Sequence, residues 1–207
     1  MKLDEIAIAC GTDKSSLIHN YTFLYENHFK HLRECHIKLL EIGIDQGSSL
    51  EMWHKYFFRS EIFGIDIKDC SHFDEPRLTT YKGSQADPEF LSRINSICGP
   101  FDIIIDDGSH FNEHMKISFT TLFPLLKSNG IYVIEDIYCC YWRHTGRPIF
   151  IDYLTGLVGA LLKYGYTDRP GEIYCFDPSY ENKAYTEIEK SIKSIEFYQD
   201  IVFITKK

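Results

Sequence analysis

The chain has 207 residues, of which 44% are hydrophobic and 25% are charged. This balance is close to the average of globular proteins and excludes a disordered, collagen-like or low-complexity chain. The 30 acidic and 22 basic residues give a formal charge of -8, which argues against a general nucleic-acid-binding protein, because such proteins neutralise phosphates with a basic surface.

Apolar runs rich in Ile and Val alternate with helical segments along most of the chain. The expected strands are residues 37–42, 61–65, 78–82, 101–105, 131–134, 194–198 and 200–206. This alternation is typical of βαβ units, and the closeness of the last two runs indicates an antiparallel hairpin. We predict one domain over residues 1–207 with a doubly wound, Rossmann-like α/β fold and a mostly parallel, seven-stranded sheet.

Two segments fall outside this rhythm and are expected to cover the sheet edge. Residues 1–35 form a predicted N-terminal cap, whose Asp13, His19 and Tyr21 could close over a ligand. Residues 138–189 are rich in Gly and Pro and form a candidate substrate lid, with a helix expected over residues 152–164.

At the start of the candidate lid, Tyr141, Trp142 and Arg143 offer aromatic and basic side chains that could contact a substrate. A surface loop with ordinary packing explains them equally well.

The first strand leads through a turn with two glycines, Gly43 and Gly47, into a helical pattern. A dinucleotide-binding turn would have a glycine at Asp45, whose carboxylate would instead repel a diphosphate. This disfavours a nicotinamide-dependent oxidoreductase. The E-x-G-x-x-x-G spacing from Glu41 resembles that of class I methyltransferases, which bind the phosphate-free, positively charged cofactor S-adenosylmethionine. A tight turn without a ligand is the alternative.

Polar residues also follow the second and third expected strands. Asp66 lies 19 residues beyond Gly47 (66 - 47), near the spacing at which a strand-end acid meets a ribose. Gln85 and Asp87 stand where methyltransferases contact adenine, although Asp66 and Asp87 could instead cap surface turns. The predicted cofactor-binding residues are Glu41, Gly43, Gly47, Asp66, Gln85, Asp87 and Asp106.

Two acidic pairs end the fourth and fifth expected strands, Asp106-Asp107 and Glu135-Asp136. Two carboxylates 4 Å apart repel by about 4 kcal/mol at an effective dielectric constant near 20. We therefore expect a divalent cation bound by Asp107, Glu135 and Asp136, and the oxygen ligands favour Mg²⁺, with Mn²⁺ and Ca²⁺ as alternatives. Asp106 faces the other way along its strand and is assigned to the cofactor. Helix capping or pairing with Lys and Arg is the competing interpretation.

His110 follows the first acidic pair by three residues. The ordinary pKa of histidine, near 6.5, allows a neutral imidazole to accept a proton at neutral pH. We predict that His110 is a catalytic general base beside the cation. A structural role is the more common fate of a single histidine.

The cellular context follows from the cysteines and the start of the chain. The seven cysteines are odd in number and never spaced C-x-x-C, which opposes a disulfide framework and a structural zinc site. No apolar run is long enough for a membrane span, and the first residues lack the features of a secretory signal. We expect a cytoplasmic protein with reduced, mostly buried thiols, and a homo-oligomer remains open.

Several motifs together resemble the metal-dependent sugar O-methyltransferases of the mycinamicin and macrocin type. The matching residues are Gly11 to Lys14 with His19, Tyr21 and Tyr25; Glu41 to Gly43 with Gly47; Gln85 and Asp87; Asp106 to His110; Val133 to Asp136; and the terminal runs from Ser194 to Tyr198 and Ile201 to Phe203. The resemblance implies methyl transfer from S-adenosylmethionine to a sugar hydroxyl.

By the same resemblance, Mg²⁺ is held by the residues matching Asp107, Glu135 and Asp136, and His110 is the base. The acceptor could be a macrolide sugar or a capsule, lipopolysaccharide or other glycan sugar. A catechol-type O-methyltransferase is the alternative enzyme, and a cofactor-binding module without catalysis is the alternative outside enzymes.

Overall fold

The computed structural model describes residues 1–142, 144, 147–167 and 184–207. Within these residues, seven strands form one sheet in the order β3-β2-β1-β4-β5-β7-β6. The strands are β1 (Lys38–Ile42), β2 (Glu61–Asp66), β3 (Leu78–Lys82), β4 (Ile103–Asp106), β5 (Ile131–Ile134), β6 (Ile192–Phe197) and β7 (Val202–Lys206). Strands β1 to β5 are parallel, and β7 is antiparallel to β5 and β6. The predicted fold class is confirmed.

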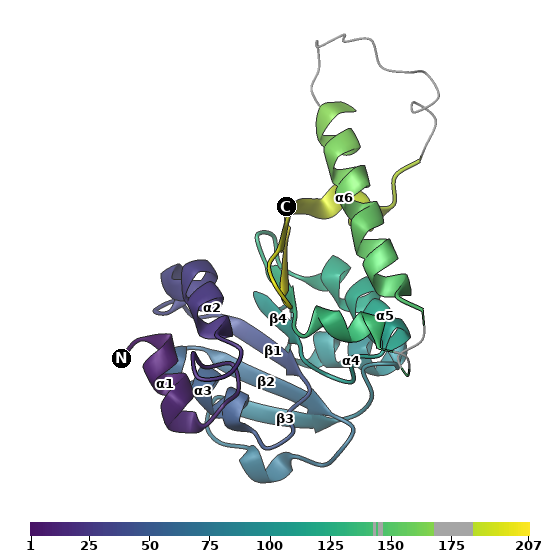
Figure 1. Ribbon diagram of the computed structural model, residues 1–207. Helices are drawn as coiled ribbons and strands as arrows, with labels where there is room; N and C mark the ends of the chain where they lie inside the picture. The colour runs from purple at the N-terminus through teal and green to yellow at the C-terminus, as the bar shows by residue number, and fades with distance from the viewer. Residues whose placement is uncertain (143, 145–146, 168–183) are drawn as a thin grey trace.

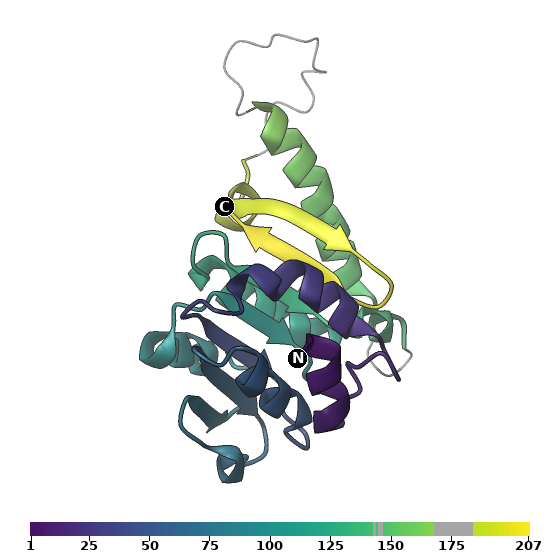
Figure 2. The ribbon, with the colours of Figure 1, turned by 90° about the vertical axis from the view of Figure 1, so that its left-hand side faces the viewer.

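Helices flank the sheet on both faces, with α1 and α3 on one side and α4 and α5 on the other (Figure 1). The helices are α1 (Leu3–Cys10), α2 (Tyr21–Phe29), α3 (Ser48–Tyr56), α4 (Pro88–Cys98), α5 (Asn112–Leu122), α6 (Ile149–Thr167) and α7 (Glu187–Ser191). Figure 2 shows α6 extending away from the sheet beyond the C-terminal hairpin.

The core consists of two clusters, one on each face of the sheet, and successive side chains of β1 point into alternate clusters. Leu39 packs in the cluster that contains Trp53 of α3, and Leu40 packs in the one that contains Phe119 of α5. All four side chains are fully buried. Because both faces of the central strands are covered, these strands need apolar residues at successive positions.

The predicted boundaries differ from the observed ones at several elements. The fourth strand begins at Ile103 instead of residue 101, and the Asp102 carboxylate just before it accepts a hydrogen bond from the backbone N–H of Lys38. The helix expected over residues 152–164 runs from Ile149 to Thr167. The predicted strand 194–198 begins at Ile192, with an irregular register before Ser194.

The chain reverses its direction of winding between β1 and β4, so the turns after these strands lie side by side. At Gly43, a Cβ atom would lie 2.1 Å from the backbone oxygen of Asp107, and the φ of Gly43 is +90°. Glycine thus allows the two turns to touch at the switch point, where open α/β sheets bind ligands.

Glu41 points into the core beside α3. It is fully buried and accepts hydrogen bonds from Ser49 Oγ at 2.9 Å and Trp53 Nε1 at 3.3 Å. These contacts fasten α3 to β1. Burial raises the pKa of Glu41 to about 7, because an apolar environment disfavours the charged carboxylate.

Substitution of two glycines separates backbone strain from steric clash. Gly11 has a φ of +72° with open space where a Cβ would lie. We expect Gly11→Ala to lower the free energy of unfolding by about 1 kcal/mol, and Gly43→Ala to lower it by about 3 kcal/mol or more, because a clash adds to the strain. Urea unfolding of the two variants measures both values, and equal losses would contradict the tight contact at Gly43.

Substitution of Glu41 tests its pKa. The folded-state pKa, about 7, lies above the ordinary value of 4.5, so Glu41 makes the free energy of unfolding fall as pH rises through this window. Relative to wild type, Glu41→Gln should gain stability between pH 4.5 and 7, by roughly 3 kcal/mol at most. Exposed Glu34→Gln is the control, and parallel pH curves for Glu41→Gln and wild type would contradict the prediction.

Candidate functional site

A cleft of about 630 Å³ lies at the carboxyl ends of the parallel strands. Of the predicted cofactor-binding residues, Gly43, Asp66 and Gln85 line it, as does the predicted metal ligand Asp107. Asp13 from the N-terminal segment also lines it. The cleft is therefore built from the turns after β1 to β4 and is bordered by the predicted cap.

Asp66 shapes the turn that follows β1. Its Oδ2 accepts hydrogen bonds from the backbone N–H groups of Ile44 at 3.0 Å and Asp45 at 3.4 Å, and its Oδ1 accepts one from Lys68 at 2.8 Å. These N–H groups outweigh the effect of burial and lower the pKa of Asp66. Asp66 is thus an ionised side chain at the wall of the cleft.

Gln85 connects two strand ends within the cleft wall. Its Oε1 accepts a hydrogen bond from Ser109 N–H at 2.6 Å, and its Nε2 donates to Asp106 Oδ1 at 3.0 Å. Asp106 is almost fully buried and also accepts from Ser118 Oγ and from Tyr132 OH at 3.1 Å. Asp106, assigned to the cofactor from the sequence, therefore lies behind Gln85 and does not line the cleft.

Three other predicted cofactor residues also lie outside the cleft lining. Glu41 points into the core beside α3. Gly47 precedes α3 with a φ of +77°, and a Cβ there would lie 2.7 Å from the Phe73 ring. Asp87 is exposed and caps α4, accepting hydrogen bonds from the N–H groups of Glu89 and Phe90. Asp87 therefore has the capping role that the sequence offered as the alternative to adenine contact.

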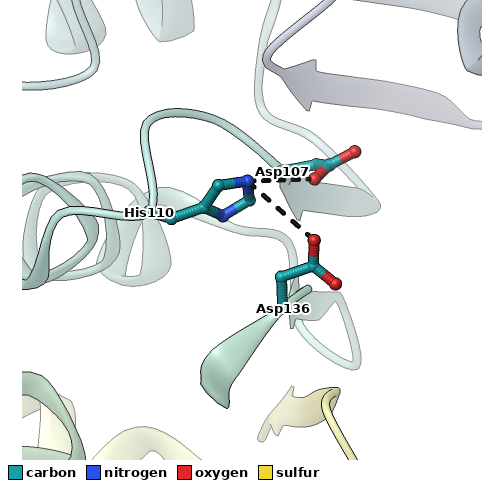
Figure 3. Close-up of side chains that lie close together, drawn as sticks. All are labelled: Asp107, His110 and Asp136. Carbon is teal, nitrogen blue, oxygen red and sulfur yellow. Dashed lines mark ion pairs between the residues drawn. The ribbon is translucent and has the colours of Figure 1, made fainter. Parts of the chain in front are cut away.

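Asp107, His110 and Asp136 gather at the ends of β4 and β5 (Figure 3). His110 Nε2 lies 3.8 Å from Asp107 Oδ1 and 4.0 Å from Asp136 Oδ2. One ligand atom from each residue falls within 4.8 Å of the others. Two ligands of one Mg²⁺ ion lie about 3 to 4.2 Å apart, given bonds of about 2.1 Å, so a small adjustment would bring one oxygen of Asp107 and one of Asp136 onto the same cation, with His110 beside it.

His110 and Asp136 both adopt left-handed backbone conformations, with φ values of 58° and 52°. Asp45, on the cleft wall, does the same, with a φ of 46°. Such conformations cost a non-glycine residue of order 1 kcal/mol or more and concentrate at functional sites. Three of the seven non-glycine residues with positive φ in the described chain thus lie at this edge.

Lys14 is a buried cation that the sequence did not single out for a role. Its Nζ lies 2.5 Å from Asp107 Oδ2 and 2.7 Å from Glu135 Oε2, and its side chain is only 2% exposed. Burial alone would lower the pKa of Lys14, but the facing carboxylates outweigh burial and raise it well above the ordinary value. Lys14 therefore remains an ammonium and offsets the charge of the two acids.

Helix α2 supplies two tyrosine hydroxyls to the neighbouring acids. Tyr21 OH donates to Asp136 Oδ1 at 2.6 Å, and Tyr25 OH donates to Glu135 Oε1. Burial and the nearby carboxylate raise the pKa of Tyr21, so its hydroxyl stays protonated. The sequence pointed to both tyrosines but not to their contacts with the acids. Because the tyrosines are four residues apart, they share one helix face, and that spacing is the sequence signal that could have indicated a shared role.

Glu135, predicted as the third metal ligand, thus lies apart from the group of Asp107, His110 and Asp136. Its two oxygens face Lys14 and Tyr25, and it is buried. Direct ligation of a cation by Glu135 would require these partners to move, and it stays a prediction.

An exposed aromatic group lies close to this edge. Tyr138 and Trp142 pack edge to face with ring centroids 5.5 Å apart, and the ring of His144 lies 5.2 Å from Trp142 and 6.2 Å from Phe111. Tyr141, the other predicted substrate residue in the described chain, is 66% exposed. Arg143 and residues 168–183 of the candidate lid lie outside the described residues.

The cysteines and the hydrophobicity of the helices bear on the expected cellular context. Six cysteines in the described part of the chain have free thiols, and four of these are buried. The seventh, Cys175, lies outside it. A search of the described helices finds none that could cross a membrane.

Comparisons with known proteins place this site in context. No protein-family model matches the chain. It is 37% identical to mycinamicin VI 2''-O-methyltransferase of Micromonospora griseorubida, over 99% of this chain and 52% of that protein. It is 44% identical to demethylmacrocin O-methyltransferase of Streptomyces fradiae, over 70% of this chain and 38% of that protein. The chain spans about half the length, or less, of these curated relatives.

Solved structures agree with the sequence comparison. MycE methyltransferase from the mycinamycin biosynthetic pathway, in complex with Mg and SAH, matches with a TM-score of 0.88 and 35% identity, over 100% of this chain and 54% of that one. A Podospora anserina methyltransferase matches with a TM-score of 0.55 at 15% identity, which supports the fold alone. Over nearly its whole length the chain is thus similar to part of the mycinamicin- and macrocin-type sugar O-methyltransferases, and it has the class I methyltransferase fold.

Proposed function

We propose that this chain transfers a methyl group from S-adenosylmethionine to a hydroxyl of a sugar or glycan-type acceptor, assisted by a divalent cation. The observation that carries the proposal is the convergence of Asp107, His110 and Asp136 beside a cleft at the switch point of the sheet. The relatives named above are O-methyltransferases, and one matching structure contains Mg and SAH.

The cleft supports the cofactor part of the proposal. Asp66 is an ionised acceptor on its wall and would accept hydrogen bonds from ribose hydroxyls. Gln85 is held by Asp106 and Ser109 and offers a fixed amide to an adenine. Gly43 brings the turn after β1 against the turn after β4 at the wall of the cleft. Glu41, Asp87 and Asp106 would then not contact the cofactor themselves. Each would support the cleft by stabilising the helix or side chain that it binds.

The acidic edge supports the chemical part of the proposal. Asp107 and Asp136 would hold the cation through the oxygens that face His110. A bound divalent cation supplies positive charge that lowers the pKa of an acceptor hydroxyl. His110 would accept the hydroxyl proton at Nε2. The hydroxyl oxygen is thereby left as a stronger nucleophile toward the methyl group.

The exposed aromatic group supports a sugar acceptor. Tyr141, Trp142 and neighbouring rings could stack on the apolar face of a pyranose. A catechol-type acceptor also fits a cation beside a base. The sugar is favoured because the curated relatives include enzymes named for rhamnosyl and olivosyl groups. The particular sugar and hydroxyl, a cytoplasmic location and a homo-oligomer remain proposals.

Removal of the cation or of one ligand should stop methyl transfer. Excess chelator, Asp107→Asn or Asp136→Asn should lower turnover by more than about 100-fold, because loss of a ligand is expected to exceed the 10- to 100-fold effect of losing a supporting partner. The assay follows labelled methyl transfer to a panel of macrolide glycosides, nucleotide sugars and catechols. Asp152→Asn, on an exposed helix position, is the matched control. Full turnover with chelator present would refute the cation.

Loss of the imidazole should affect turnover selectively. We expect His110→Ala to lower turnover by about 10² to 10⁴-fold, the usual contribution of a general base, while S-adenosylmethionine affinity changes little. Calorimetry measures the affinity and the labelled-methyl assay measures turnover. His31→Ala, on an exposed histidine, is the control. Unchanged turnover in His110→Ala would remove this residue from the mechanism.

A further inference from the structure

Asp107 and Asp136 each direct one carboxylate oxygen toward His110 and the other toward a side chain of the N-terminal segment. Asp107 turns Oδ2 toward Lys14 and Oδ1 toward His110. Asp136 turns Oδ1 toward Tyr21 and Oδ2 toward His110. In each case the N-terminal segment takes one oxygen, and the other oxygen is left on the histidine side, as Figure 3 shows for the carboxylates themselves.

The direction of the Asp136 carboxylate depends on a neighbouring side chain. It follows β5 with a left-handed backbone and precedes the 3-10 turn η4 (Ile137–Tyr141). The terminal torsion of an aspartate has no sharp preference, so the backbone leaves the carboxylate plane undefined. The 2.6 Å hydrogen bond from Tyr21 OH supplies the missing constraint.

Tyr21 is itself firmly held. It is the first residue of α2 and is 3% exposed. Its ring stacks on His19 with centroids 5.1 Å apart and an interplanar angle of 19°. One turn further along α2, Tyr25 binds Glu135, which neighbours Asp136. The hydroxyl of Tyr21 therefore sits on a rigid support.

We propose that Tyr21 is a positioning residue for the cation site, which fixes the Asp136 carboxylate so that Oδ2 is presented toward His110. This inference rests on the proposed function, because it concerns the same cation. Hydrogen-bond partners of metal ligands typically change metal affinity by about 10 to 100-fold when they are removed. A hydroxyl that only contributed to packing would have no such effect.

The test measures Mn²⁺ binding to the full chain by the loss of the free-ion electron paramagnetic resonance signal. Tyr21→Phe keeps the ring and its stacking on His19, and removes only the hydroxyl. We expect its Mn²⁺ affinity to be about 10 to 100-fold below that of wild type. Its melting temperature and S-adenosylmethionine affinity should stay near wild type, since Tyr21 does not line the described cleft.

The matched control is Tyr198→Phe. Tyr198 OH also donates to a carboxylate, Glu196 Oε2 at 3.2 Å, but on the exposed turn of the C-terminal hairpin. We expect its Mn²⁺ affinity to equal that of wild type.

The outcomes separate this inference from the proposed function. If wild type binds Mn²⁺ and folded Tyr21→Phe binds it equally well, the positioning role is wrong while the cation site stands. If Tyr21→Phe loses affinity and Tyr198→Phe does not, the positioning role is supported. If wild type binds no Mn²⁺, the proposed cation site falls, and the inference falls with it.

Discussion

The site depends on the balance of charge at the carboxyl ends of β4 and β5. Asp107, Glu135 and Asp136 are brought together there because the two strands are parallel neighbours in register. Lys14 binds two of these acids from a buried position. One ammonium offsets only part of the negative charge, so the edge retains an attraction for a further cation on the side of His110.

The N-terminal segment therefore does more than cover the cleft. Lys14, Tyr21 and Tyr25 each bind an acid at the sheet edge. The first turn of α2 and the loop before it are thus joined electrostatically to strand ends more than 90 residues away in the chain. The N-terminal segment thus helps to organise the acidic edge.

The cofactor cleft and the acidic edge are linked through one short connection. The segment after β4 carries Asp107, Gly108 and Ser109 along the cleft and ends at His110. Gln85 binds Ser109 N–H from the opposite wall. A Cβ at Gly108 would lie 2.0 Å from Gln85 Oε1. Tight packing here joins the proposed base to the wall of the proposed cofactor cleft, and group transfer requires reacting groups to be held in a fixed geometry.

The sequence by itself determined the order of strands and helices, the terminal hairpin and the acidic strand ends. These features follow from local patterns, such as apolar runs, turn residues and acids placed directly after strands. It also offered capping as the alternative role of Asp87, and the structure places this residue at the start of α4, where its side chain accepts two backbone hydrogen bonds.

Only the tertiary structure decided which partner each acid finds. Asp106 turns to Gln85, Ser118 and Tyr132, and Glu135 turns to Lys14 and Tyr25. These partners lie 12 to 121 residues away along the chain. Hydrogen bonds and ion pairs act over a few ångströms, so the packing of distant segments, and not the local residue pattern, selects among the carboxylates.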